Sequence, residues 1–198
     1  MFGSGQKQGT AKAGAKTTTL HSIAAMLVGR GFGGRFDVGD VSYGFIFSPA
    51  KAAVSGGKLQ LSGSFAAFDK RANVHDLKYV PAKATLLAAQ GGIGTAPLRK
   101  QLPSDVSTAH PDLPVVESTG PLSFCGVLYF KLAPLDARTL AVPADMRQLQ
   151  LNVRLAPVND AERGLQGAFS SVVDALYGKE VDGSAAEAAV SELNKLLS

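Results

Sequence analysis

Residues 41–65, VSYGFIFSPAKAAVSGGKLQLSGSF, give the clearest indication of the fold class. Large apolar residues alternate with small or polar ones over 41–47 and again over 58–65, which is the period of a strand with one buried face. Pro49 is expected to end the first strand, and Ser55-Gly56-Gly57 is typical of a tight hairpin turn. The stretch therefore predicts antiparallel strands joined by a short turn. The positions expected to face the core are Val41, Tyr43, Phe45, Phe47, Leu59, Leu61, Gly63 and Phe65.

Three further segments predict strands. Ala82–Ala88 is a short apolar run, and within Met146–Leu155 polar and apolar residues alternate from Gln148 onward. Ser123–Leu132 is apolar on both faces, which is typical of a central strand that is covered on both sides. Because few helical segments separate these strands, they favour an antiparallel β-sandwich or an open barrel over a parallel sheet. The fold class is therefore mainly β, and α+β when both ends of the chain are included.

Helical spacing is found at both ends of the chain. Over Thr18–Val28 apolar residues recur every three or four positions, and this spacing predicts a short N-terminal amphipathic helix. Residues 157–198 predict a C-terminal helical hairpin, and Gly178 is expected to end its first helix. The expected capping pairs of the hairpin are Asn159 with Glu162 and Ser184 with Glu187. The expected apolar stripes of the hairpin are Leu165, Ala168, Phe169, Val172, Leu176 and then Ala186, Ala189, Val190, Leu193, Leu197.

The chain of 198 residues has the length of one domain with appendages. Residues 1–36 are assigned to a basic, glycine-rich N-terminal arm that contains the short helix. Residues 37–156 form the β-rich domain, and its segment 90–121 is a long loop rich in Pro and Gly. Loops of this length are uncommon inside a compact domain unless they have a function, so this loop is a candidate for partner binding. Residues 157–198 form the helical hairpin.

The positive charge of the chain is concentrated in the N-terminal arm. The formal net charge is +4, and residues 1–36 contain five basic residues and no acidic one. The remaining 15 basic and 16 acidic residues give the rest of the chain a net charge of −1. A basic arm on a nearly neutral body favours docking to an acidic surface, although a solubilising tail has the same composition. The candidate partner-binding residues are Lys7, Lys12, Lys16, Arg30 and Arg35.

No arrangement of residues in the sequence is typical of a catalytic, metal or cofactor site. Gly29–Gly34 lacks the spacing of a dinucleotide-binding loop, and it is interpreted as a hinge between arm and body. Cys125 is the single cysteine and lies in the most apolar segment, which favours an inert buried thiol. The histidines, His21, His75 and His110, lack partners at metal-ligand spacing. We therefore expect no catalytic residue, no metal ligand and no cofactor.

These observations predict a non-enzymatic accessory subunit that docks to a larger protein assembly through its basic arm. The alternative function is a carrier that holds an apolar or lipid-like ligand in a cavity lined by Phe45, Phe47, Phe65 and Leu151. An enzyme whose catalytic residues converge only in the folded chain is a third hypothesis, since it needs no sequence motif.

The expected partners are other protein subunits, and an acidic membrane surface is a further candidate. A nucleic acid is less favoured, because few aromatic residues accompany the basic ones. No apolar run approaches the roughly 20 residues of a transmembrane helix, so no transmembrane segment is expected. The expected location is cytoplasmic, or peripheral to a membrane. An organelle transit peptide stays open because residues 1–36 lack acidic side chains.

Overall fold

The computed structural model describes residues 17–69, 77–90, 126–178 and 180–198, which form a mainly β structure with two C-terminal helices. The first strands are β1 (Thr18–Thr19), β2 (Ser22–Val28), β3 (Gly31–Val38), β4 (Val41–Ser55) and β5 (Lys58–Asp69). They are followed by β6 (Tyr79–Gln90), β7 (Gly126–Leu132), β8 (Ala144–Asp145) and β9 (Gln150–Leu155). The two helices are α1 (Asp160–Tyr177) and α2 (Gly183–Leu197).

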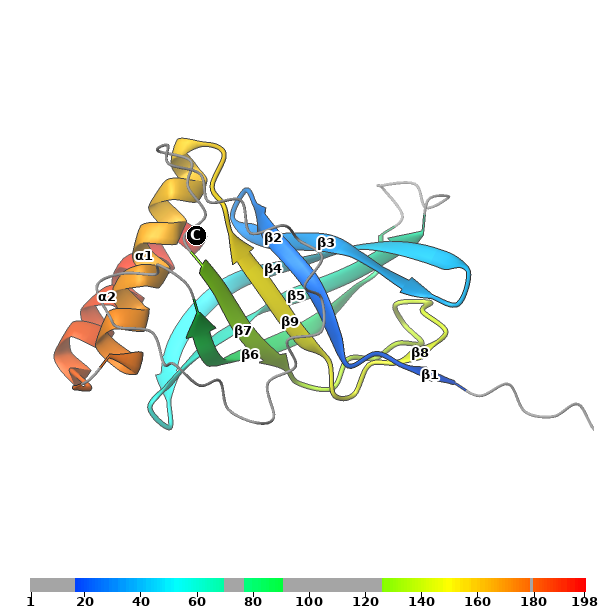
Figure 1. Ribbon diagram of the computed structural model, residues 1–198, viewed down its shortest axis with the longest axis horizontal. Coiled ribbons are helices and arrows are strands. Elements are labelled where there is room, and N and C mark those ends of the chain that lie inside the picture. Colours follow the sequence, from blue (N-terminus) through cyan, green and yellow to red (C-terminus); the bar gives the residue numbers. More distant parts are fainter. Residues whose placement is uncertain (1–16, 70–76, 91–125, 179) are drawn as a thin grey trace, which may run out of the picture.

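Seven strands close into a barrel in the order β2-β3-β4-β5-β6-β7-β9 (Figure 1). Neighbouring strands are antiparallel except β2 and β9, which pair in parallel from Ser22 with Gln150 to Met26 with Arg154. Strand direction alternates around the barrel, so an odd number of strands leaves the two closing strands parallel. The expected barrel is confirmed, but it is closed rather than open, and the expected β-sandwich is wrong.

The expected helix over Thr18–Val28 is also wrong, because this segment contains β1 and β2. Ile23, Ala25 and Leu27 point into the barrel and are 1–4% exposed, while Met26 and Val28 alternate with them and face outward. Ile23 and Leu27 are four residues apart. That spacing is about one helical turn and also two strand repeats, so it fits both structures. Pairing with β3 and β9 on either side selects the strand.

The glycine-rich segment after β2 is a tight turn and the start of a strand, not the expected hinge. Val28 pairs with Gly31, so only Gly29 and Arg30 connect β2 to β3. Gly29 has a φ of 59°, a left-handed conformation that favours glycine. Gly34 lies on β3, and a Cβ at this position would collide with the Ala24 carbonyl oxygen. The glycines therefore allow β3 to pack closely against β2. Both strands begin within residues 1–36, the range assigned to the arm.

The predicted hairpin is confirmed. Ser55 pairs with Lys58, and Gly56 and Gly57 form the turn with φ angles of 57° and 70°. Two successive positive φ angles match the right-handed twist of the flanking strands. Pro49 marks a shift of register within β4 rather than its end, because β4 continues to Ser55. A proline is tolerated at such an irregularity, since it has no N–H to contribute to the ladder.

Aromatic side chains fill the interior of the barrel. Phe45 and Phe65 stack with ring centres 5.5 Å apart, and Phe32 lies 6.0 Å from Phe47 and 5.6 Å from Phe130. All five are at most 1% exposed. Burying side chains of this size supplies about 1.5–3 kcal/mol each from the hydrophobic effect. The closed wall and the packed aromatic rings form one core.

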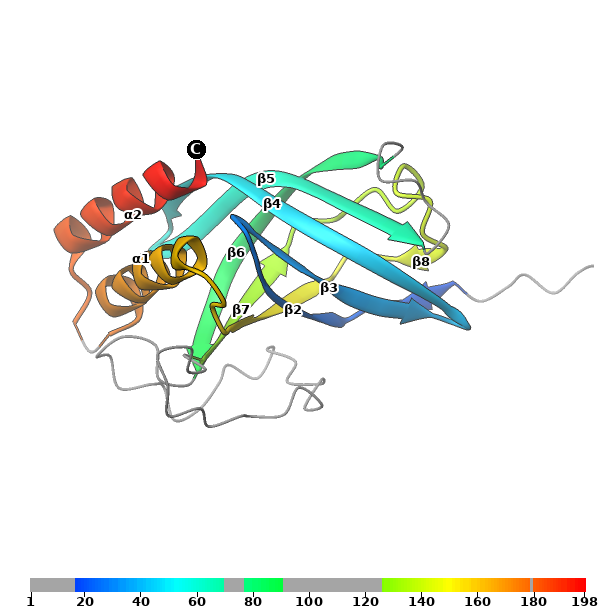
Figure 2. The same ribbon diagram turned by 90° about the horizontal axis from the view of Figure 1, so that it is seen from above.

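Each end of the barrel is covered by a different segment (Figures 1 and 2). The two helices lie side by side at one end of the barrel. There the ring centres of Phe169 on α1 and Phe32 are 5.7 Å apart. The segment 133–149, which includes β8, lies at the opposite end, and β1 pairs with β8 there. We call this second end the barrel mouth. The buried residues of segment 133–149 are Leu135, Leu140, Val142, Ala144, Met146 and Leu149.

The predicted stripes of both C-terminal helices are confirmed, because every residue in them is buried. Asn159 caps α1 as expected, and its Oδ1 accepts a hydrogen bond of 2.9 Å from the Glu162 N–H. The cap of α2 is Asp182, which accepts from the Ala185 N–H at 2.9 Å, rather than the expected Ser184. Asp182 lies one turn ahead of the buried stripe, where its carboxylate also favours the positive end of the helix.

Two polar contacts fix the helices to the barrel. The side chain of Asn194 on α2 accepts from the Ala52 N–H at 2.7 Å and donates to the Ala52 carbonyl at 3.0 Å. Pairing between β3 and β4 extends to Phe47. The Asn194 side chain therefore bonds to a part of β4 that β3 does not cover. The Tyr177 hydroxyl on α1 donates to the Leu86 carbonyl at 2.6 Å. The helical hairpin is thus joined to both β4 and β6.

Candidate functional site

An exposed apolar surface lies on the outer side of β2, next to the start of α1. We define the β2 patch as Met26, Val28, Ile46 and Val158. Met26 is 46% exposed, Val28 50% and Val158 72%, and Ile46 is half-buried. Met26 is the register partner of Gly33, and Gly33 is the partner of Ile46, so these residues form one row on the outer face. Exposed apolar residues that gather in this way are typical of an interaction surface.

A buried carboxylate holds the two halves of the β2 patch together. Glu162 is 3% exposed, and its two carboxylate oxygens bond to two different segments. The Gly29 N–H donates to Oε1 at 3.1 Å, and the Val158 N–H donates to Oε2 at 2.9 Å. Val28, which precedes Gly29, is therefore fixed beside Val158. Such charge-assisted bonds are stronger than neutral ones, so the patch has a defined shape.

Arginines surround the β2 patch. Arg35 is exposed and lies two residues after Gly33 on the same outer face of β3. Two residues along a strand correspond to a rise of about 6.6 Å between their Cα atoms. Arg30 lies in the β2–β3 turn, and its Nη1 donates to the main-chain oxygen of Ser198. Arg154 is the register partner of Met26 and is half-buried. Three guanidinium groups thus border one apolar surface.

The structure describes two of the five residues expected to bind a partner. Arg30 and Arg35 both border the β2 patch, although Arg30 also contacts the end of α2. The other three, Lys7, Lys12 and Lys16, lie outside the described residues, as do the loop 90–121 apart from Gln90, and His75, His110 and Cys125. His21 is exposed. Partner binding by these five residues therefore stays a prediction, and the structure shows only where Arg30 and Arg35 lie.

The outer face of β7 and β9 differs from the β2 patch because Tyr129, Gln150 and Asn152 are buried there, while its exposed side chain is that of Lys131. Tyr129 is 5% exposed, Gln150 5% and Asn152 8%. The Tyr129 hydroxyl donates to the Gln90 Oε1 at 2.7 Å, and burial raises the pKa of this tyrosine. Exposure of large apolar groups on the barrel wall is thus greater on the β2 side than here.

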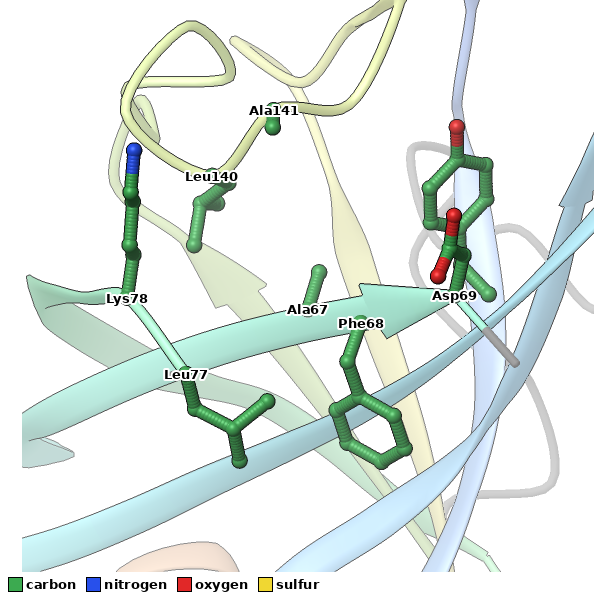
Figure 3. Close-up of a pocket in the computed structure, with 8 residues that line it drawn as sticks. Ala67, Phe68, Asp69, Leu77, Lys78, Leu140 and Ala141 are labelled. Carbon is green, nitrogen blue, oxygen red and sulfur yellow. The ribbon is translucent and has the colours of Figure 1, made fainter. Parts of the chain in front are cut away.

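A pocket of about 180 Å³ opens at the barrel mouth (Figure 3). It lies where β4 begins, β5 ends and β6 begins, below the segment 133–149. Asp69 and Lys78 stand at opposite sides of it in Figure 3, and Leu140 lies above. Tyr43 is the register partner of Asp69 across β4 and β5. The lining residues are Tyr43, Ala67, Phe68, Asp69, Leu77, Lys78, Leu140 and Ala141.

Two aspartate turns hold the segment above the pocket. Asp136 accepts from the Arg138 and Thr139 N–H groups and from the Thr139 hydroxyl, and these bonds lower its pKa. Asp145 accepts from the Arg147 side chain and main chain, which lowers its pKa to about 2. Ala141 has a φ of 57°, which is unusual for a residue with a Cβ. The backbone of this segment is therefore held by local bonds before and after Leu140 and Ala141 in the sequence.

Within residues 17–69, 77–90, 126–178 and 180–198, no group of three or more His, Cys, Asp or Glu is placed to hold a metal ion. Neither helix in this part of the chain is long and apolar enough to cross a membrane. No family model, curated protein or solved structure matches the chain.

Sequence reasoning missed the apolar part of the β2 patch and the whole pocket. Met26 and Val28 could have been identified if residues 22–28 had been interpreted as a strand. The two-residue repeat of a strand places both side chains on the outer face. The pocket has no such signal, because its residues come from β4, from β5, from the two residues before β6 and from the segment 133–149. Only the closed barrel brings them together.

Proposed function

We propose that this chain is a non-enzymatic accessory subunit that docks to a larger protein assembly through the β2 patch and its arginine border. The observation that carries the proposal is the exposure of Met26, Val28 and Val158 beside one another on a surface fixed by Glu162. A rigid apolar centre with a polar border is the usual anatomy of a protein interface. Arginine is among the residues that contribute most to such interfaces.

The partner is a protein surface that combines exposed apolar groups with carboxylates. Arg30, Arg35 and Arg154 give the border of the patch a positive charge, and the N-terminal sequence adds Lys7, Lys12 and Lys16 without any acid up to residue 36. Guanidinium groups bind carboxylates through paired hydrogen bonds, so acidic side chains on the partner complement this border. The apolar centre supplies affinity, and the border supplies orientation and a faster association.

The test is native purification at low salt with variants of the patch. The wild-type chain is expected to co-purify with a stoichiometric protein partner, and Val28→Asp and Arg35→Glu are each expected to lose it. Val181→Asp is the matched control, because Val181 is 68% exposed and lies in the connection between the helices, away from the patch. Loss of the partner in the control as well, or its retention in both patch variants, contradicts the proposal.

Salt and lipid give two further readouts. Attraction between exposed charges is screened over about 8 Å at physiological ionic strength, so higher salt is expected to weaken the wild-type complex. Binding of the chain to anionic vesicles with the same loss in both patch variants would instead assign the surface to a membrane.

The alternative function, transport of an apolar ligand inside the barrel, has less support. Phe45, Phe47, Phe65 and Leu151 were expected to line a cavity, and all four are at most 1% exposed within the packed core. Phe45 and Phe65 are in stacking contact. A ligand in this position has to displace aromatic side chains that already pack against one another.

A further inference from the structure

We propose that the pocket at the barrel mouth binds a short zwitterion whose ammonium and carboxylate groups are separated by an apolar chain. This ligand site is independent of the docking surface, because none of its lining residues belongs to the β2 patch.

The charges of the lining have opposite signs. Among the residues of the described part of the chain that line the pocket, Asp69 and Lys78 are the two with a formal charge. A charged ligand group that leaves water needs a partner of opposite charge. Asp69 therefore selects an ammonium and Lys78 selects a carboxylate. A carboxylate has about four lone-pair sites, so Asp69 accepts a ligand donor in addition to its contacts within the protein.

The two charges are kept apart by apolar side chains. In Figure 3, Ala67 lies between Asp69 and Lys78, and Leu140 lies above the space that separates them. A ligand that reaches both charges must therefore cross an apolar region. An α-amino acid has both of its charges on one carbon and reaches only one side. An ω-amino acid carries its charges at the two ends of a methylene chain and fits the arrangement.

The volume suits a ligand of this size. One water molecule needs about 10–15 Å³ of such a cavity, so a pocket of about 180 Å³ has room for a ligand larger than a few waters. That space holds a short methylene chain with its two terminal groups. Leu140 and Ala67 provide contacts for the methylene groups, and each CH₂ removed from water contributes about 0.8 kcal/mol.

The first experiment titrates the full-length chain with ε-aminocaproate in a calorimeter. Saturable binding of one molecule per chain is expected. Norleucine is an isomer with both charges on one carbon, and hexanoate and hexylamine each carry only one charge. All three are expected to bind about tenfold more weakly or worse, as expected for the loss of about 1.4 kcal/mol. Absence of saturable binding, or equal binding of norleucine, overturns the proposal.

Variants then assign the two charges. In Asp69→Asn, ε-aminocaproate is expected to bind no better than hexanoate, and in Lys78→Met no better than hexylamine. Lys78 is exposed, so its replacement leaves the core intact. Lys83→Met is the matched control, because Lys83 is also exposed on β6 and does not line the pocket. Equal affinity in wild type and in both pocket variants contradicts the assignment.

One further ligand identifies the source of the zwitterion. A protein that ends in lysine presents the same pair of separated charges as ε-aminocaproate, and Nα-acetyl-lysine reproduces that chain end. Tighter binding of Nα-acetyl-lysine assigns the pocket to a protein terminus, and tighter binding of ε-aminocaproate assigns it to a free small molecule. These titrations use the isolated chain, so their outcome is separate from the docking test of the β2 patch.

Discussion

Asp145 and Arg147 show how single residues shape the barrel mouth. The Arg147 Nη2 donates to Asp145 Oδ2 at 2.6 Å, and the Arg147 main-chain N–H donates to Oδ1 at 3.0 Å. These bonds favour the ionised carboxylate and lower the pKa of Asp145 from 3.8 to about 2. The turn they close follows β8 directly, so the pair supports the segment above the pocket.

We predict that Arg147→Ala returns the pKa of Asp145 toward 3.8, measured by carboxyl-carbon NMR during an acid titration. The folded pKa of Asp145 is below its ordinary value, so the pair stabilises the fold above pH 3.8. That contribution is lost as the pH falls through about 2. Asp136→Asn is the control, because it alters a separate turn and should leave the pKa of Asp145 unchanged. An unaltered Asp145 pKa in Arg147→Ala would exclude the pairing.

At the scale of elements, the attachment of α2 to β4 depends on one side-chain amide. Asn194 makes two hydrogen bonds to Ala52, which is 2% exposed and lies beyond the part of β4 that β3 covers. An amide side chain supplies the same donor and acceptor that a neighbouring strand would supply. The helix thus completes the hydrogen bonding of β4 at this position.

We predict that Asn194→Ala lowers the free energy of unfolding by about 1–3 kcal/mol, because it leaves a buried N–H and a buried carbonyl without this partner. Urea denaturation followed by circular dichroism measures the change. Ser191→Ala, at an exposed position on the same helix, is the control and should change the free energy by less than about 0.5 kcal/mol. Equal effects of the two substitutions would argue against the contact with β4.

Elements with a strong local signal were predicted from the sequence, and elements defined by distant pairing were not. The Gly56–Gly57 turn and the stripe around Phe169 are local, and both are confirmed. β2 was predicted as a helix because its apolar spacing fits both periods, and β3 was missed because its glycines resemble a linker. The same difference between local and distant signals applies to the two candidate sites. Arg30 and Arg35 are apparent in the sequence from their charge alone, whereas the pocket combines residues of β4 and β5 with the two residues before β6 and with segment 133–149.

At the scale of the whole molecule, the barrel and the helical hairpin share one core. The ring centre of Phe169 on α1 lies 5.7 Å from that of Phe32 on β3 and 6.4 Å from that of Phe130 on β7. All three side chains are fully buried. Elements that share a buried cluster lose their packing together, so the two parts are expected to unfold in one cooperative transition.

We predict that Phe169→Ala destabilises the chain by about 3–5 kcal/mol and leaves a single transition. Circular dichroism follows the helices, and near-ultraviolet absorption follows the tyrosines, including Tyr43 and Tyr129 in the barrel. The two melting curves should coincide in wild type and variant. Separate transitions, with the helical signal lost first, would mean that the hairpin is not part of the barrel core.

Closure of the barrel by β2 and β9 is the central claim, because it fixes both the outward row of the β2 patch and the mouth that contains the pocket. The most direct measurement is a set of interstrand nuclear Overhauser effects on the isotope-labelled chain. Parallel pairing predicts contacts between the backbone protons of Ile23 and Leu151 and between those of Ala25 and Val153. Helical contacts between residues three apart over 20–28, without any contact to residues 150–154, would contradict the closed barrel.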